Sequence, residues 1–202
     1  MQALSPKPGQ VLAVDLDGTL IATDLLHEGV WMLLRRQPFG AVGLALALAR
    51  GGRSGMKAWL AGRVSVDPAT LPYRAPVLAL VRDWRAKGGQ AVLVTAADTA
   101  PAQAVAAHLG LFDAVHASRP GRNLKGPVKA RFLVESFGAG GFVYVGDAAA
   151  DLPVWAGAAV AVTVGAGAGL RARVAALGVP VLHLPGTPLC PGDAVLRVPG
   201  ND

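Results

Sequence analysis

Residues 10–20 read "QVLAVDLDGTL", a short apolar run that ends in Asp15 and Asp17. An unbroken apolar run of this length is typical of a strand that a parallel sheet buries on both faces. Two charges so close to the end of a buried strand indicate either that the chain meets solvent at a turn or that the carboxylates belong to a binding site. The rest of the sequence has to decide between these two readings.

Further apolar runs of strand type follow this first one. They cover residues 90–98, 114–118, 141–147, 159–165 and 179–185. Helical patterns at 99–109 and 126–138 lie between them. Strands that alternate with helices at this spacing predict an α/β fold, a Rossmann-like, doubly wound and mostly parallel sheet.

Residues 23–89 interrupt the alternation and show helical patterns only. These patterns cover residues 25–36, 38–50, 55–64 and 74–89. A stretch of about 65 residues is too long for one crossover helix. We therefore predict a catalytic core formed by residues 1–22 and 90–202, with an α-helical cap inserted at 23–89. Trp31, Trp59 and Trp84, each on a different predicted helix, are expected to anchor the cap.

The positive charge of the chain is concentrated in the same segment. Residues 23–89 hold ten Lys or Arg and four Asp or Glu, which accounts for the whole net charge of +6. Such a patch can attract an anionic substrate, lipid headgroups or nucleic acid, or it can be a solvated helix face. Because no nucleic-acid motif accompanies it, we expect no nucleic-acid partner, and peripheral association with a membrane or a membrane enzyme stays open.

Cysteine content and apolar run length bear on the compartment. Cys190 is the one cysteine, so no internal disulfide framework is expected. The first ten residues lack a signal-like apolar core. The longest strongly apolar run, 39–49, falls short of the roughly 20 residues that span a bilayer. The sequence thus predicts a cytoplasmic protein, soluble or peripheral, and a place at the inner face of the membrane stays open.

Polar residues follow three of the predicted strands. Asp15 and Asp17 follow the first, Thr95 lies in the second beside Ala96, and Asp147 follows the third with Asp151 four residues on. Ligands of open parallel sheets bind beyond the carboxyl ends of the strands, so these side chains converge if the strands are neighbours. Lys125 precedes a helix that begins near the same edge, and Lys129, one turn later, is its rival. We favour Lys125.

The residue types indicate a metal and a phosphoryl group. In extended backbone, Asp15 and Asp17 would project from one face about 6–7 Å apart. Together with Asp147 and Asp151 they would repel one another unless a cation binds. No His or Cys joins the group, so Mg²⁺ suits it better than zinc. One metal, one lysine and one hydroxyl together suit phosphoryl transfer.

Four stretches resemble, in order, the sequence motifs of the haloacid dehalogenase superfamily. They are "DLDGTL" (15–20), "LVTAAD" (93–98), "LKG" (124–126) and "VGDAAAD" (145–151), and the resemblance covers residues 11–165. It implies the α/β core described above, a helical cap between the first two motifs, and Mg²⁺-dependent chemistry on small phosphate esters.

The resemblance implies roles for the first motif. Asp15 would be the nucleophile that forms an aspartyl-phosphate, and Asp17 the general acid and base. Gly18 and Thr19 would shape the following turn beside the phosphate. The dehalogenases of the superfamily lack the second aspartate, so Asp17 favours a phosphatase.

It also implies roles for the later motifs. Thr95, with Ala96 beside it, would bind the phosphoryl group, and Lys125 would hold the nucleophile and phosphate charges together. Asp147 would bind Mg²⁺ with Asp15 and the backbone carbonyl of Asp17, and Asp151 would act through a metal-bound water.

A narrower similarity concerns the stretches "VDLDGTLIATDLLHEG", "VSVDPATLPY", "NLKGPVKA" and "YVGDAAADLPVW". They look like the phosphatase-like domain that some bacterial proteins join to an intramembrane prenyltransferase. This similarity makes a lipid-linked phosphate a candidate substrate beside a small phosphorylated metabolite. Two alternatives stay open: a phosphotransferase or mutase that uses the same intermediate, and a non-catalytic partner of a membrane prenyltransferase.

Overall fold

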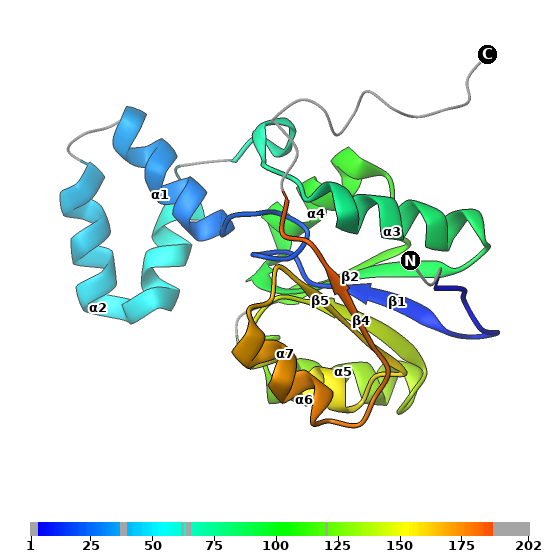
Figure 1. The fold of residues 1–202 in the computed structure, drawn as a ribbon. Coiled ribbons are helices and arrows are strands. Elements are labelled where there is room, and N and C mark those ends of the chain that lie inside the picture. Colours follow the sequence, from blue (N-terminus) through cyan, green and yellow to red (C-terminus); the bar gives the residue numbers. More distant parts are fainter. Residues whose placement is uncertain (1–3, 37–39, 62, 64–65, 120, 188–202) are drawn as a thin grey trace, which may run out of the picture.

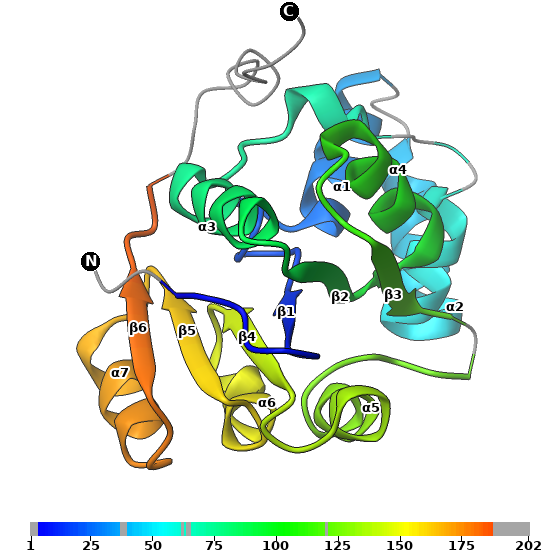
Figure 2. The same ribbon diagram turned by 90° about the vertical axis from the view of Figure 1, so that its right-hand side faces the viewer.

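The computed structural model describes residues 4–36, 40–61, 63, 66–119 and 121–187, so Cys190 lies outside the described residues. Its centre is a six-stranded sheet in the order β3-β2-β1-β4-β5-β6, with every neighbouring pair parallel (Figure 2). The strands are β1 (Val11–Val14), β2 (Gln90–Asp98), β3 (Ala114–Ser118), β4 (Phe142–Gly146), β5 (Val160–Val164) and β6 (Val181–Leu184). The predicted parallel α/β fold is confirmed.

Helices cover both faces of this sheet (Figures 1 and 2). On one face lie α3 (Ala75–Ala86) and α4 (Thr99–Leu109). On the other lie α5 (Pro127–Phe137), α6 (Leu152–Ala156) and α7 (Ala168–Ala175). Two short 3₁₀ helices are also present: η1 (Pro68–Thr70) precedes α3, and η2 (Ala149–Asp151) precedes α6. The sheet is therefore doubly wound.

Strand β1 is central, and its side chains alternate between the two faces. Leu12 and Val14 belong to the apolar cluster under α3 and α4, whereas Val11 and Ala13 belong to the cluster under α5, α6 and α7. Asp15 follows Ala13 by two residues and so continues the second face. This register directs Asp15 toward α5.

Helix α3 packs with the sheet. Its buried residues Val77, Leu78, Val81 and Trp84 belong to the same cluster as β1 and β2. The indole of Trp84 donates to the carbonyl of Gln90 at the start of β2 (2.9 Å). The predicted cap of 23–89 therefore extends too far. Buried Leu71 and Tyr73 belong to the same cluster as α3, so we restrict the proposed helical insertion to 23–70. Trp84 anchors the main core rather than a cap.

Helices α1 (Leu25–Arg36) and α2 (Gly40–Ala61) stand beside the sheet, on the left of Figure 1. They meet where buried Leu60 of α2 lies beside Gly29 of α1 and buried Leu33 of α1 lies beside Gly40 of α2. Gly52, with φ 58° and ψ −154°, interrupts α2, so its two halves match the two helices that the sequence predicts there. Trp31 is 60% exposed, and the expectation that it anchors the cap is wrong. Within the described part of the chain, no helix is both long enough and apolar enough to cross a bilayer.

Candidate active site

The carboxyl ends of β1, β2 and β4 lie side by side and bring the predicted site residues together. Val14 is in register with Leu93 of β2 and with Val145 of β4. The backbone N–H of Asp15 donates to the carbonyl of Val145 (3.0 Å). Thr95 and Asp147 each lie two residues beyond a register partner of Val14. The expectation that these three strands are neighbours is confirmed.

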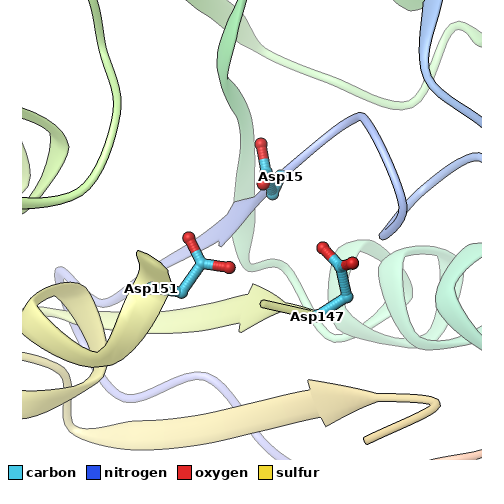
Figure 3. Close-up of side chains that lie close together, drawn as sticks. All are labelled: Asp15, Asp147 and Asp151. Atoms are coloured by element: carbon cyan, nitrogen blue, oxygen red, sulfur yellow. The ribbon is translucent and has the colours of Figure 1, made fainter. Parts of the chain in front are cut away.

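Asp15, Asp147 and Asp151 form a carboxylate cluster (Figure 3). One oxygen from each side chain lies within 4.8 Å of the others. The three come from the end of β1, the end of β4 and the 3₁₀ helix η2. Three carboxylate oxygens with no His or Cys are the donor set that a hard divalent cation such as Mg²⁺ or Ca²⁺ takes. The cluster could hold such an ion.

The electrostatics of the cluster fit the same conclusion. Burial and the charge of Asp15 raise the pKa of Asp147, although the hydroxyl of Thr19 and the guanidinium of Arg74 act against this shift. Burial and the charge of Asp15 also raise the pKa of Asp151, to about 6. Such shifts mean that the carboxylates ionise reluctantly without a cation. A divalent ion would remove the repulsion.

Lys129, not Lys125, is the lysine beside the predicted nucleophile. Its Nζ lies 2.8 Å from Asp15 Oδ1, and only 2% of its side chain is exposed. Lys129 shares the buried face of α5 with Leu133, one turn further on, whereas Lys125 precedes the helix and is exposed. The preference for Lys125 is therefore wrong. The four-residue spacing of Lys129 and Leu133 is the sequence signal that could have corrected it.

Asp17 does not join the carboxylate cluster of the described residues. Its Oδ1 accepts from the backbone N–H of Leu25, the first residue of α1 (2.8 Å). The 6–7 Å expectation assumed extended backbone, but β1 ends at Val14. The carbonyl of Leu16 then accepts from the N–H groups of Leu20 and Ile21, which folds the chain into a turn. The turn directs Asp17 toward the insertion.

Gly18 and Thr19 support Asp147. Gly18 has φ 76°, and a Cβ there would lie 2.3 Å from Asp147 Oδ2, so only glycine fits. The buried hydroxyl of Thr19 donates to Asp147 Oδ1 (2.8 Å). The turn that the sequence predicts thus holds a candidate metal ligand in place.

Thr95 lies 1% exposed near the carboxyl end of β2. Its Oγ1 accepts from the N–H of Ala97 (2.9 Å), which leaves its own proton available to donate. Ala96, between them, is half-buried. Their contact with a phosphoryl group stays a prediction.

Sequence reasoning missed two polar residues of this region. Arg74, just before α3, donates through Nε to the carbonyl of Gly18 (3.0 Å) and through Nη1 to the carbonyl of Gly186. Tyr144 is fully buried in β4, and burial and the nearby carboxylates raise the pKa of its hydroxyl well above its usual value. No motif contains Arg74. Tyr144 comes just before "VGD" within an apolar strand pattern, so in the sequence it looks like an ordinary core residue.

The chain is similar to known proteins over most of its length. Residues 12–155 match the family model described as haloacid dehalogenase-like hydrolase. The uncharacterized protein y4nM of Sinorhizobium fredii is 42% identical over 173 residues, which are 86% of this chain. The chain spans only about a third (33%) of the length of that relative.

Solved structures share the fold at low sequence identity. A probable phosphoserine phosphatase from Vibrio cholerae is 17% identical with a TM-score of 0.63, covering 95% of this chain and 67% of its own. A Bordetella pertussis protein of unknown function is 21% identical with a TM-score of 0.62, covering 86% and 98%. A haloacid dehalogenase family hydrolase from Salmonella enterica serovar Typhi is 16% identical with a TM-score of 0.62, covering 88% and 69%.

Proposed function

The chain belongs to the haloacid dehalogenase-like hydrolases, and from this premise we propose that it is a phosphatase that forms an aspartyl-phosphate on Asp15. One observation carries the proposal. Asp15 stands at the end of a buried strand, paired with the buried ammonium of Lys129 and within a carboxylate cluster suited to a cation. A nucleophile held beside two sources of positive charge is what attack on a phosphoryl group needs.

The proposed steps use two aspartates. A carboxylate oxygen of Asp15 forms a bond to phosphorus as the ester oxygen leaves, and Asp17 gives that oxygen its proton. Asp17 then accepts a proton from water as the water oxygen attacks the aspartyl-phosphate, which releases phosphate and restores Asp15. Lys129 and the hydroxyl of Thr95 would stabilise the negative charge of the transferring group.

We propose Mg²⁺ as the cofactor, held by Asp15 and Asp147, with Asp151 contributing through water. When bound, the ion would neutralise phosphoryl oxygens that are otherwise repelled by the carboxylates. The resemblance also assigns the backbone carbonyl of Asp17 to the ion, and this ligand stays a prediction.

The proposed substrate is a small or lipid-linked phosphate ester. Several apolar side chains of the α1–α2 hairpin are exposed: Trp31 (60%), Leu34 (37%), Val42 (70%), Leu46 (47%) and Leu48 (45%). Exposed Arg35 and Arg50 lie on the same hairpin, and exposed Arg63 follows α2. Apolar side chains with basic residues suit the surface of an anionic membrane. A cytoplasmic location, with this hairpin at the inner face of the membrane, stays a prediction, as does a connection with an intramembrane prenyltransferase.

Phosphate release from an aryl phosphate, with and without Mg²⁺, tests the proposed reaction. We expect turnover by the wild type with Mg²⁺, and loss of about 10³-fold or more for Asp15→Asn, which removes the nucleophile. Activity that survives this substitution would refute the assigned nucleophile. Absence of turnover with any phosphate ester would favour the alternative of a non-catalytic partner.

The second alternative, a phosphotransferase or mutase, shares the aspartyl-phosphate and differs in the acceptor. Comparing free phosphate release with transfer to added alcohols separates the two. We expect phosphate release to dominate, and preferential transfer at low alcohol concentration would favour the phosphotransferase.

Sedimentation with lipid vesicles tests the membrane surface. We expect binding to vesicles that contain anionic phosphatidylserine, weaker binding for Trp31→Ala, and little binding to neutral phosphatidylcholine vesicles. Equal recovery with both vesicle types would exclude the electrostatic part of this proposal.

A further inference from the structure

The hydroxyl of Tyr144 lies between Lys129 and Asp151, and the proposed steps give it no task. The side chain is fully buried under α5 and α6. Its oxygen accepts from Lys129 Nζ (2.9 Å) and donates to Asp151 Oδ1 (2.8 Å). We propose that Tyr144 is a positioning residue that keeps the Lys129 ammonium on Asp15 and away from Asp151. This inference rests on the proposed function.

Two carboxylates compete for one buried ammonium. Lys129 Nζ lies 2.8 Å from Asp15 Oδ1 and 3.9 Å from Asp151 Oδ1. Both carboxylates carry the same charge, and a buried ammonium is attracted strongly to either. Coulomb attraction alone therefore does not decide which of them holds the lysine.

The hydroxyl resolves this competition. It gives Asp151 Oδ1 a neutral donor, while Asp151 Oδ2 accepts from the backbone N–H of Ala148 (3.2 Å). Both oxygens of Asp151 are thus supplied with hydrogen bonds that do not come from Lys129. The lysine makes its shortest ionic contact with Asp15, where the proposed reaction needs it.

The surrounding core fixes the position of this hydroxyl. The ring of Trp155 meets the Tyr144 ring edge-on, with centroids 6.2 Å apart, and its indole donates to the Tyr144 carbonyl (3.3 Å). A Cβ on Gly146 would lie 2.8 Å from Tyr144 Cε1 and 2.7 Å from Asp151 Oδ2. Because Gly146 has no side chain, the side chains of Tyr144 and Asp151 both fit beside it. The close packing of the Tyr144 ring holds its hydroxyl in one position.

The substitution Tyr144→Phe removes the hydroxyl and keeps the ring. We expect kcat for an aryl phosphate to fall about 10- to 100-fold, the worth of a hydrogen bond to a charged group, with KM changed less than about threefold. Phe142→Leu is the matched control, because Phe142 is buried in the same cluster on the same face of β4. It should lower the melting temperature and leave kcat unchanged. An equal loss of kcat in both variants would show a packing effect and overturn the proposal.

A double-mutant cycle tests whether Tyr144 acts by keeping Asp151 from competing with Asp15 for Lys129. In an Asp151→Asn background the second negative charge is absent, so adding Tyr144→Phe should cost less than about threefold in kcat, because the two substitutions act through the same contact. A full 10- to 100-fold cost in that background would mean that the hydroxyl acts in another way, which would contradict the proposal.

A crystal structure of the Tyr144→Phe variant tests the inference without any assay. We expect Lys129 Nζ to move from Asp15 toward Asp151. If the wild type hydrolyses no phosphate ester, the proposed function fails, yet this displacement still decides whether Tyr144 positions the lysine. A lysine that stays on Asp15 in the variant would refute the inference.

Discussion

Lys125 and Lys129 lie four residues apart, yet only Lys129 is buried against Asp15. Replacing Lys129 by Met removes a charge that would stabilise the transferring phosphoryl group. We expect the rate of phosphate release to fall about 10²- to 10³-fold, as when one transition-state donor is lost. Lys125→Met is the matched control and should stay within about twofold of wild type, since exposed substitutions act weakly. The opposite order of the two effects would restore Lys125 as the site lysine.

The backbone conformation at position 18 and the neighbouring side chain of Asp147 both require glycine there. Its φ of 76° disfavours any side chain, and a Cβ would displace Asp147 from the carboxylate cluster. We expect Gly18→Ala to weaken Mg²⁺ binding at least about tenfold, because one ligand carboxylate is displaced. Isothermal titration with Mg²⁺ measures this effect. Gly9→Ala is a suitable control, since it shares a positive φ of 73° but would meet no atom within 4 Å. Unchanged affinity in Gly18→Ala would show that Gly18 is not needed to hold Asp147 in a metal-binding position.

At the scale of residues, the sequence predicted which residue types form the site better than it predicted where each side chain points. Asp15, Asp147 and Asp151 come together because strand ends in a parallel sheet share one edge. Asp17 and the site lysine were misplaced, because their positions depend on a turn after Val14 and on the residue at which α5 begins. Arg74 contacts Gly18 and Gly186, which lie far from it in the chain, so no local pattern contains these contacts. Tyr144 contacts Lys129 and Asp151 across helix and strand boundaries, and its apolar strand pattern does not reveal them.

Elements differ in how firmly the core holds them. Helix α3 contributes four buried residues to the main apolar cluster, whereas α1 contributes Leu25 at its first position and otherwise packs on α2 beside the sheet. We expect Leu78→Ala in α3 to lower the free energy of unfolding by about 2–5 kcal/mol, measured by urea denaturation. Leu33→Ala in α1 removes an equally buried side chain and serves as the comparison. It should reduce the hydrogen-exchange protection of α1 and α2 while leaving that of β1 and β4 unchanged. Loss of protection in β1 from Leu33→Ala would show that hairpin and core unfold as one unit.

The elements that the sequence predicted best are those whose pattern is local. The bounds of β2 and α4 follow from an apolar run and from the Gly110 C-cap. Helices α6 and α7 are harder to find, because α6 has five residues and α7 buries only Val174. The end of the insertion was placed too late, since α3 resembles the preceding helices in sequence and only its packing on β2 separates it from them.

At the scale of the whole molecule, the carboxylate cluster combines residues from both halves of the sheet. Folding stability and metal binding should therefore both depend on pH. Burial and the charge of Asp15 raise the pKa of Asp151 to about 6, above the 3.8 of an exposed carboxyl. Between these two values the folded protein binds more protons than the unfolded chain. The stability that this group contributes to the metal-free protein is therefore greatest at low pH and is lost as pH rises through 6. Asp151→Asn, which has no such proton, isolates the contribution.

Mg²⁺ binding should show the opposite dependence on pH, because the ion needs ionised carboxylates. At pH 7.5 and a concentration of 100 times Kd, we expect Mg²⁺ to stabilise the fold by about 2.7 kcal/mol. At pH 5 the gain should largely disappear, because protons compete with the ion at Asp151 and at Asp147, whose pKa is also raised. Thermal melts from pH 5 to 8, with and without Mg²⁺, measure both trends. Asp147→Asn should abolish the gain at every pH, whereas Asp83→Asn, an exposed carboxylate of α3 paired with Lys87, should leave it unchanged. A gain in melting temperature that is independent of pH, or that survives Asp147→Asn, would place the ion elsewhere on the molecule.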